Sequence, residues 1–352
     1  MTRKFWKRQP RSGSAPPTFY NARPWVGVVL IALIVAVTNG LSGCSPSARD
    51  YFDRAEKYSK KGEFDKAIEN YSKVIAMVPK RAIPYNDRGL AYYGKGDLDR
   101  AIADYDQAIE LSPKFKQAYY NRAVAYHAKG DFERALADSD QSIELDPKDA
   151  KAYFGRASVY ADKGDRDRAI SDYSRAIELD PGFSGAYYDR GITYGKKGKF
   201  DLAIGDFTKT IELDPKSTEA YNNRGIAFFH QFDIDRAIKD YSRAIELDPK
   251  SKEAYFNRGS AYGGKRDFDR AIADFSQALE LDPQYTEAYN NRGFAYLSQG
   301  DFDRAIADLT RAIELDPKYK TAYSNRGNAY QAKGETMRAE ADFRKAKELG
   351  NK

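Results

Sequence analysis

Arginine and aspartate side chains recur at fixed intervals along this chain of 352 residues. Arginine stands every 34 residues from Arg54 to Arg326, and aspartate recurs with the same spacing from Asp104 to Asp342. A carboxylate beside a guanidinium can form an ion pair, and carboxylates can also act as acids or bases. Catalysis needs one site whose groups have distinct pKa values, whereas this pairing is repeated along the chain. We therefore interpret these residues as structural ion pairs.

The residues most often found in reactive or metal-binding sites are scarce. The chain contains two histidines, His127 and His230, and one cysteine, Cys44. These are too few for a disulfide framework or a zinc cluster. No Ser/His/Asp or Cys/His arrangement and no phosphate-binding loop motif is present in the sequence. The sequence predicts that the protein is not an enzyme and that it has no catalytic residues, no cofactor and no metal site.

The same 34-residue interval, running from Ala48 to the C-terminus, also predicts the elements that position these side chains. Small and apolar residues recur at three- and four-residue spacing on both sides of a central glycine such as Gly96, which predicts two amphipathic helices joined by a tight turn. Gly96 suits the left-handed conformation that ends the first helix, Asp97 and Asp99 can cap the second, and Pro113 stops it. One such unit cannot stand alone, so neighbouring units must stack.

The interval resembles the tetratricopeptide repeat. In the second interval the resemblance is carried by Gly89, Tyr92, Gly96, Ala101, Tyr105, Ala108 and Pro113. The Trp or Leu usual at the first two signature sites is replaced by Tyr and Arg. The resemblance implies an all-α fold, a right-handed α-solenoid superhelix of nine helix-turn-helix hairpins. The nine repeats span residues 48-81, 82-115, 116-149, 150-183, 184-217, 218-251, 252-285, 286-319 and 320-352.

The resemblance also implies a partner groove. In this family the first helices line the concave face, and their second, fifth, sixth, ninth and twelfth positions point inward. We therefore predict a groove of fifth-position aromatic residues, Phe52, Tyr120, Phe154, Tyr188 and Phe256, and sixth-position asparagines, Asn121, Asn223, Asn257, Asn291 and Asn325. An asparagine amide can both donate to and accept from an extended peptide backbone, and aromatic rings add contact area. The alternative is that the asparagines only order neighbouring helices.

Two departures from the repeat pattern concern the turn. Phe232 stands where repeat six should have its turn glycine, and Arg266 does so in repeat seven. These exceptions could mark a bend, a contact with a partner, or drift in the sequence. No lysine precedes the asparagines at the fifth position, so the groove departs from the type that grips chaperone C-termini.

The first residues differ in kind from the repeats. Residues 1–43 carry six basic side chains and no acid, so they account for the whole formal net charge of +6. The rest of the chain is formally neutral and does not indicate nucleic-acid binding. The apolar stretch from Val26 to Val37 is short for a membrane-spanning helix and is typical of a signal-peptide core.

The segment Leu41-Ser42-Gly43-Cys44 resembles the lipobox of bacterial lipoproteins. That resemblance implies that residues 1–43 are a signal peptide that is removed, that Cys44 is lipidated, and that residues 44–47 form a short tether. Ser45 resembles the residue found in lipoproteins sent to an outer membrane. The alternative is an uncleaved signal anchor.

These features favour a non-catalytic protein–protein interaction scaffold or adaptor of the bacterial cell envelope, lipid-anchored at the outer membrane and facing the periplasm. The expected partners are envelope proteins or extended peptide segments in the concave groove, together with the membrane itself. Neither nucleic acid nor a small-molecule substrate is expected. The alternative is a lipoprotein that binds glycans or assists exopolysaccharide export or secretion, with the inner aromatic rings stacking on sugars.

Overall fold

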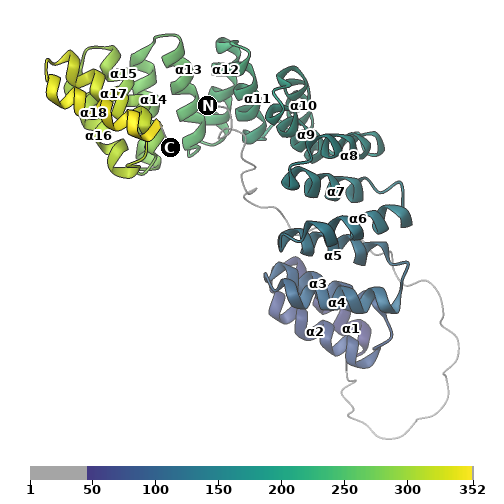
Figure 1. Cartoon of the computed structure of the whole chain (residues 1–352). Helices are drawn as coiled ribbons and strands as arrows, with labels where there is room; N and C mark the ends of the chain where they lie inside the picture. Colours follow the sequence, from purple (N-terminus) through teal and green to yellow (C-terminus); the bar gives the residue numbers. More distant parts are fainter. Residues whose placement is uncertain (1–45, 351–352) are drawn as a thin grey trace, which may run out of the picture. The chain divides into compact units, whose positions relative to one another are not determined.

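A computed structural model describes residues 46–350 of the chain. These residues form eighteen α-helices, and no strand occurs among them. Successive helices pair as nine hairpins, in which the two helices pack together along their length (Figure 1). The prediction of an all-α solenoid of nine helical hairpins is confirmed. The predicted signal peptide and Cys44 lie outside the described residues.

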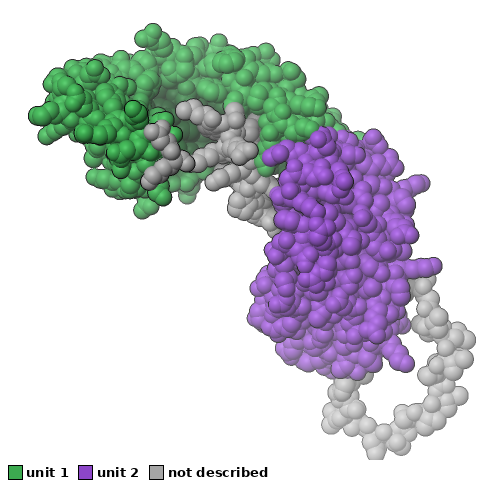
Figure 2. Space-filling view, viewed as in Figure 1, with its two compact units in different colours: residues 1–7, 181–352 green, residues 8–180 purple. Residues whose placement is uncertain are grey.

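The chain divides after Asp180 into two compact units, shown in purple and green in Figure 2. The described part of the N-terminal unit contains α1 (Ala48–Lys60), α2 (Phe64–Met77), α3 (Ala82–Gly94), α4 (Leu98–Leu111), α5 (Lys116–Ala128), α6 (Phe132–Leu145), α7 (Ala150–Lys163) and α8 (Arg166–Leu179). The described part of the C-terminal unit contains α9 (Ser184–Lys196), α10 (Phe200–Leu213), α11 (Thr218–His230), α12 (Ile234–Leu247), α13 (Lys252–Gly264), α14 (Phe268–Leu281), α15 (Thr286–Ser298), α16 (Phe302–Leu315), α17 (Lys320–Ala332) and α18 (Thr336–Gly350).

Each hairpin turns through a residue in the left-handed conformation. Glycine holds this place in seven hairpins, with φ between 72° and 92°. Phe232 and Arg266 adopt the same conformation with φ of 62° and 63°, although a side chain with a Cβ atom disfavours it. After the turn, the Asp97 carboxylate accepts a hydrogen bond from the Arg100 amide at 3.2 Å and caps α4, as predicted.

The two helices of a hairpin approach closely because one of them carries a very small residue at the crossing. At Gly89 of α3, an added Cβ atom would lie 2.6 Å from the Tyr105 ring of α4. Ala101, on the facing side of α4, has no exposed surface. Small residues at these two positions therefore allow a large aromatic ring to fill the space between the helices.

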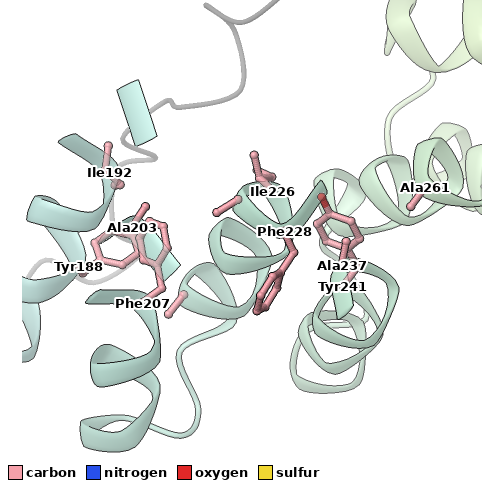
Figure 3. Packing of buried hydrophobic residues seen from close by; sticks show 11 residues of the cluster. Tyr188, Ile192, Ala203, Phe207, Ile226, Phe228, Ala237, Tyr241 and Ala261 are labelled. Atoms are coloured by element: carbon pink, nitrogen blue, oxygen red, sulfur yellow. The ribbon is translucent and has the colours of Figure 1, made fainter. Parts of the chain in front are cut away.

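That aromatic ring, eight residues into the second helix, is the largest element of the core. Tyr71, Tyr105, Tyr173, Phe207 and Tyr241 are among the largest fully buried side chains of the described chain. Figure 3 shows one such site in the C-terminal unit, where Tyr188 of α9 lies beside Phe207 of α10 with their ring centroids 5.9 Å apart. This position holds an aromatic ring in seven repeats, whereas Ser139 and Leu309 occupy it in repeats three and eight. Where the ring is present, its burial gives the hairpin a small core that its neighbours complete.

Stacking within each unit joins the second helix of one hairpin to the first helix of the next. First helices also contact one another, as α3 and α5 do in the N-terminal unit and α11 and α13 in the C-terminal unit. The second helices of the described chain make no contacts of that extent with one another. First helices therefore form the closer-packed, inner layer of each unit. No helix within residues 46–350 is both long and apolar enough to cross a bilayer.

Candidate binding surface of the first helices

The arginine at the seventh position of the first helix pairs with the aspartate at the twenty-third position of the same repeat. Arg88 donates from Nε and Nη2 to the two carboxylate oxygens of Asp104, at 2.8 and 2.7 Å. The same bidentate geometry, at 2.7–2.9 Å, joins Arg122–Asp138, Arg156–Asp172, Arg190–Asp206, Arg224–Asp240, Arg258–Asp274, Arg292–Asp308 and Arg326–Asp342. The interpretation of these residues as structural ion pairs is confirmed.

In seven of these arginines, Arg88, Arg122, Arg156, Arg224, Arg258, Arg292 and Arg326, the remaining guanidinium nitrogen bonds to a side chain of the preceding repeat. Arg88 Nη1 donates to the Ser72 hydroxyl of α2 at 3.0 Å, and Arg258 Nη1 donates to the Ser242 hydroxyl of α12 at 3.1 Å. One side chain thus ties three helices, its own and the second helices of two successive hairpins. The arginines therefore hold neighbouring helices together.

The asparagines of the predicted groove also make bonds between repeats. Asn121 Nδ2 donates to Asn86 Oδ1 of the preceding first helix at 2.9 Å. The same 35-residue connection joins Asn223 to the Tyr188 hydroxyl at 3.0 Å, Asn257 to Asn222 at 2.9 Å, and Asn325 to Asn290 at 3.0 Å. We call these four bonds the amide ladder. They give the asparagines an ordering role between helices, the second of the two roles considered from the sequence.

Asn291 differs from the other four asparagines. Its Oδ1 accepts a hydrogen bond from the amide of Asn290, the neighbour in sequence, at 3.0 Å. Asn291 and Asn325 are half-buried, whereas Asn121, Asn223 and Asn257 are buried. A partner lying along the first helices therefore has more access to the asparagines of repeats eight and nine than to the other three.

Four of the five fifth-position aromatic residues of the predicted groove pack on the core ring of their own hairpin, whereas the Tyr120 ring lies against Gly155 of the next repeat. The Phe52 ring meets Tyr71 edge-on with centroids 5.6 Å apart, and the Phe154 ring lies 5.7 Å from that of Tyr173. Tyr188 and Phe256 are buried, and Phe256 also lies 4.9 Å from the Tyr285 ring. Phe52, Tyr120 and Phe154 are half-buried and keep part of their surface open.

The predicted site residues came only from the fifth and sixth positions of the first helix and did not include the ninth, which the family places on the same inner face. Phe294 of α15 stands there with 49% of its surface exposed, and Asn328 of α17 is also exposed. Other repeats have Glu56, Val124, Ile226 or Ser260 at this position. The family's inward-facing positions included the ninth, so the variety of residues found there was the signal that could have identified it.

The sixth position carries acids as well as asparagines. Asp53, Asp87 and Asp189 occupy it in repeats one, two and five. Burial raises the pKa of Asp87 to about 7, which no sequence pattern indicated. This carboxyl group is the most perturbed acid of the first-helix layer among the described residues.

The two histidines occupy different surroundings. His127 Nε2 lies 2.9 Å from an oxygen of Asp162 in the next repeat, and its ring packs at 5.8 Å on Phe132. The His230 ring stacks on Phe200 with centroids 4.8 Å apart, and burial lowers its pKa. Residues 46–350 contain no group of three His, Cys, Asp or Glu side chains placed to hold a metal ion.

Sequence models of a known protein family match the residues that form the hairpins. Models of the tetratricopeptide repeat match residues 55–96, 92–130, 124–164, 150–183, 184–217, 218–251, 256–320 and 291–352. The chain belongs to the tetratricopeptide repeat family. Tetratricopeptide repeats generally serve protein–protein interaction, and the matches indicate no catalytic family. No curated protein matches the chain.

Solved structures of tetratricopeptide repeat proteins resemble parts of this array. MamA is 32% identical over 46% of this chain and 94% of its own, with a TM-score of 0.43. A tetratricopeptide repeat protein from Parabacteroides merdae is 22% identical over 70% of this chain and 98% of its own, with a TM-score of 0.53, and it shares the fold. YrrB, described as having an unusual peptide-binding site, is 26% identical over 52% of this chain and 95% of its own, with a TM-score of 0.46.

Proposed function

We propose that this tetratricopeptide repeat protein is a non-catalytic scaffold of the bacterial cell envelope, which binds extended segments of other proteins along its first helices. The observation that carries this proposal is a division of labour among positions of the repeat. Positions that join helices change little: the arginine is present in all nine repeats, the close-contact position is always glycine or alanine, and the core ring is present in seven repeats. Positions on the inner layer change from repeat to repeat.

The ninth position shows how far the inner layer varies. It holds an acid at Glu56, an aliphatic side chain at Val124, a hydroxyl at Ser260 and an exposed ring at Phe294. A row of different side chains at a regular spacing can recognise an extended segment by its sequence of side chains, because each repeat contacts another part of the segment. A catalytic centre present in every repeat would instead need the same side chains at this position in each repeat.

Attachment to the envelope forms the second part of the proposal. Its support is the leader with six basic residues and an apolar core, followed by the lipobox-like segment ending in Cys44. Acyl chains on Cys44 would hold the first repeat near the membrane, because only Ser45, Pro46 and Ser47 separate the cysteine from α1. We place the anchor in the outer membrane with the repeats facing the periplasm.

Site-specific crosslinking tests the binding surface. A photoreactive amino acid at position 294 would report the inner layer, and the same group at position 202 of α10 gives a matched control, because Phe294 and Leu202 are 49% and 48% exposed in the same unit. We expect position 294 to capture discrete proteins in intact cells and position 202 to capture few. Equal capture at both positions, or capture at 202 alone, would contradict binding along the first helices.

Substitution of the cysteine tests the anchor. We expect the full chain to enter the detergent phase after extraction and the Cys44→Ser variant to enter the aqueous phase or to retain its leader. Metabolic labelling with a palmitate analogue should mark the native chain and not the variant. Labelling of neither chain would contradict the lipid anchor while leaving the binding surface untouched.

The glycan-binding alternative requires inner aromatic rings whose faces are open to a sugar. Sugars stack on open ring faces, whereas Phe256 and Tyr188 are buried and Phe256 packs between Phe275 and Tyr285. We therefore favour a polypeptide partner. Selective retention of the native chain on a glycan array, lost when Phe52 or Phe154 is changed to alanine, would favour the glycan role instead.

A further inference from the structure

Asp87 occupies a position of α3 that is filled by asparagine in five other repeats. Its carboxylate accepts a hydrogen bond from the Asn86 amide at 2.9 Å, and Asn86 in turn accepts the bond from Asn121. The 35-residue spacing of the amide ladder pairs position 87 with Phe52, whose ring has no polar atom. Asp87 therefore lies at the N-terminal end of the ladder with acceptor capacity that the ladder does not use.

Among residues 46–350 no lysine, arginine or histidine forms an ion pair with Asp87 itself. Lys60 lies 4.0 Å from the neighbouring acid, Glu56. Glu56 of α1 adds negative charge, and the hydroxyl groups of Tyr71 from α2 and Tyr105 from α4 also feel the charge of Asp87. The pKa values of Asp87, Tyr71 and Tyr105 are raised, and the first cause in each case is burial.

Tyr105 of α4 is a second polar group of repeats one and two whose hydrogen-bonding capacity is unused. Its side chain is fully buried, and its hydroxyl has no hydrogen-bond partner within the described chain. Buried hydroxyl groups are nearly always hydrogen-bonded, so a group left without a partner calls for an explanation. Asp87 itself is half-buried, and a ligand lying along the first helices can still reach it.

We propose that Asp87, supported by Glu56, binds a basic side chain, lysine or arginine, of the polypeptide segment held along the first helices of repeats one and two. The inference rests on the proposed binding of extended segments and adds the chemistry of one anchor. A cation placed there neutralises a carboxylate that the protein itself leaves without a counter-charge, and a charge-assisted bond in a partly buried site is among the stronger polar contacts.

Binding of a cation at Asp87 is coupled to the proton on the carboxyl group. The basic side chain pairs with the carboxylate, whereas below about pH 7 the free protein holds the proton in the same place. Affinity therefore falls as the pH is lowered, approaching tenfold per pH unit well below 7. Above pH 8 the carboxyl group is fully ionised, and its titration no longer changes the affinity.

Selection from a library of random twelve-residue peptides provides the test. The full chain, the Asp87→Asn variant and the matched Asp189→Asn variant, which makes the same change at the sixth position of repeat five, are each used as bait at pH 8. We expect the native chain and Asp189→Asn to select peptides enriched in lysine or arginine. Those peptides should bind Asp87→Asn at least tenfold more weakly, and their affinity for the native chain should fall about tenfold from pH 8 to pH 6.

The outcomes separate the two proposals. Asp87→Asn should fold, because asparagine occupies this position in five repeats, and circular dichroism checks that it does. Selected peptides that lack basic residues, or that bind Asp87→Asn unchanged, overturn the Asp87 site while the proposed function stands. Failure of every bait to select any peptide overturns both.

Discussion

The two units use the sixth position of the first helix in different ways. In the C-terminal unit Asp189 occupies it in repeat five and asparagine in the four repeats that follow, and Asn223, Asn257 and Asn325 each donate to the preceding first helix. In the N-terminal unit only Asn121 does so, whereas Asp53 and Asp87 are acids and Gly155 has no side chain. An amide both donates and accepts, so it completes a bond between repeats. A carboxylate only accepts, so it leaves capacity for a ligand at some cost in stability.

The largest expected effect comes from breaking the arginine–aspartate pairs, which both units contain. Removing the guanidinium in Arg88→Met or Arg258→Met leaves Asp104 or Asp274 as a buried, uncompensated charge, and we expect each to cost about 3 kcal/mol at pH 7. The midpoint of urea unfolding measures the loss. Arg54→Met is the matched control, because Asn70 replaces the aspartate in repeat one and Arg54 is exposed. A large loss for Arg54→Met would mean that the pairing is not the cause.

Placing an aspartate, as in repeat two, at the sixth position of a repeat in the C-terminal unit should destabilise the protein by a smaller amount. In Asn257→Asp the bond to Asn222 is lost and a buried carboxyl group takes its place, and we expect a cost of about 2 kcal/mol at pH 8. At pH 4 the carboxyl group can stay protonated and donate, so most of the cost should disappear. Urea unfolding at the two pH values measures this, and an equal loss at both would argue against a charge effect.

Replacing Asp87 by asparagine, the residue that repeats six to nine have at this position, should stabilise the N-terminal unit. The folded-state pKa of Asp87 is about 7, above its ordinary value of 3.8. Between these values the folded state holds a proton that the unfolded state has released, so stability falls as the pH rises and the loss is complete above about pH 7. Asp87→Asn removes that penalty, and we expect a gain on the order of 2 kcal/mol at pH 8 that vanishes near pH 3. A gain independent of pH would place its origin elsewhere.

The smallest effect concerns the turn of repeat six. Phe232 is 88% exposed and holds a left-handed conformation that glycine holds in seven hairpins. We expect Phe232→Gly to raise stability by about 1 kcal/mol, since the strain of the Cβ atom is removed and few contacts are lost. Thermal unfolding measures this gain. Gly300→Phe, the opposite change in repeat eight, should lower stability by a similar amount.

The fold could be predicted from the sequence because its determinants recur. The period gave the hairpins, Gly96 and its equivalents gave the turns, and the constant separation of Arg88 and Asp104 gave the ion pairs. In most repeats the same residue type at the same position has the same partner, so the repeat pattern was enough to predict these contacts. Phe232 and Arg266 were recognised as exceptions, but the sequence did not show that they keep the same turn.

The role of the groove residues could not be predicted with the same certainty, because the ladder depends on the residue of the preceding repeat. Asn223 finds a hydroxyl at Tyr188 and Asn257 an amide at Asn222, whereas the position paired with Asn291 holds Phe256. Reading the sixth position against the residue 35 places earlier separates these cases. Nothing in the sequence showed that burial would raise the pKa of Asp87, since that depends on how closely α1 to α4 surround it.

The amide ladder has a consequence for how such a chain can change its length. Each bond depends on residue types at a fixed offset, so duplication or loss of a whole module keeps every partner except those at the new joint. Loss of residues 252–285 would bring Asn291 opposite Asn222, giving it the acceptor that Phe256 does not offer. In such a shortened chain the new joint between repeats would pair two asparagines where the present chain pairs asparagine with phenylalanine.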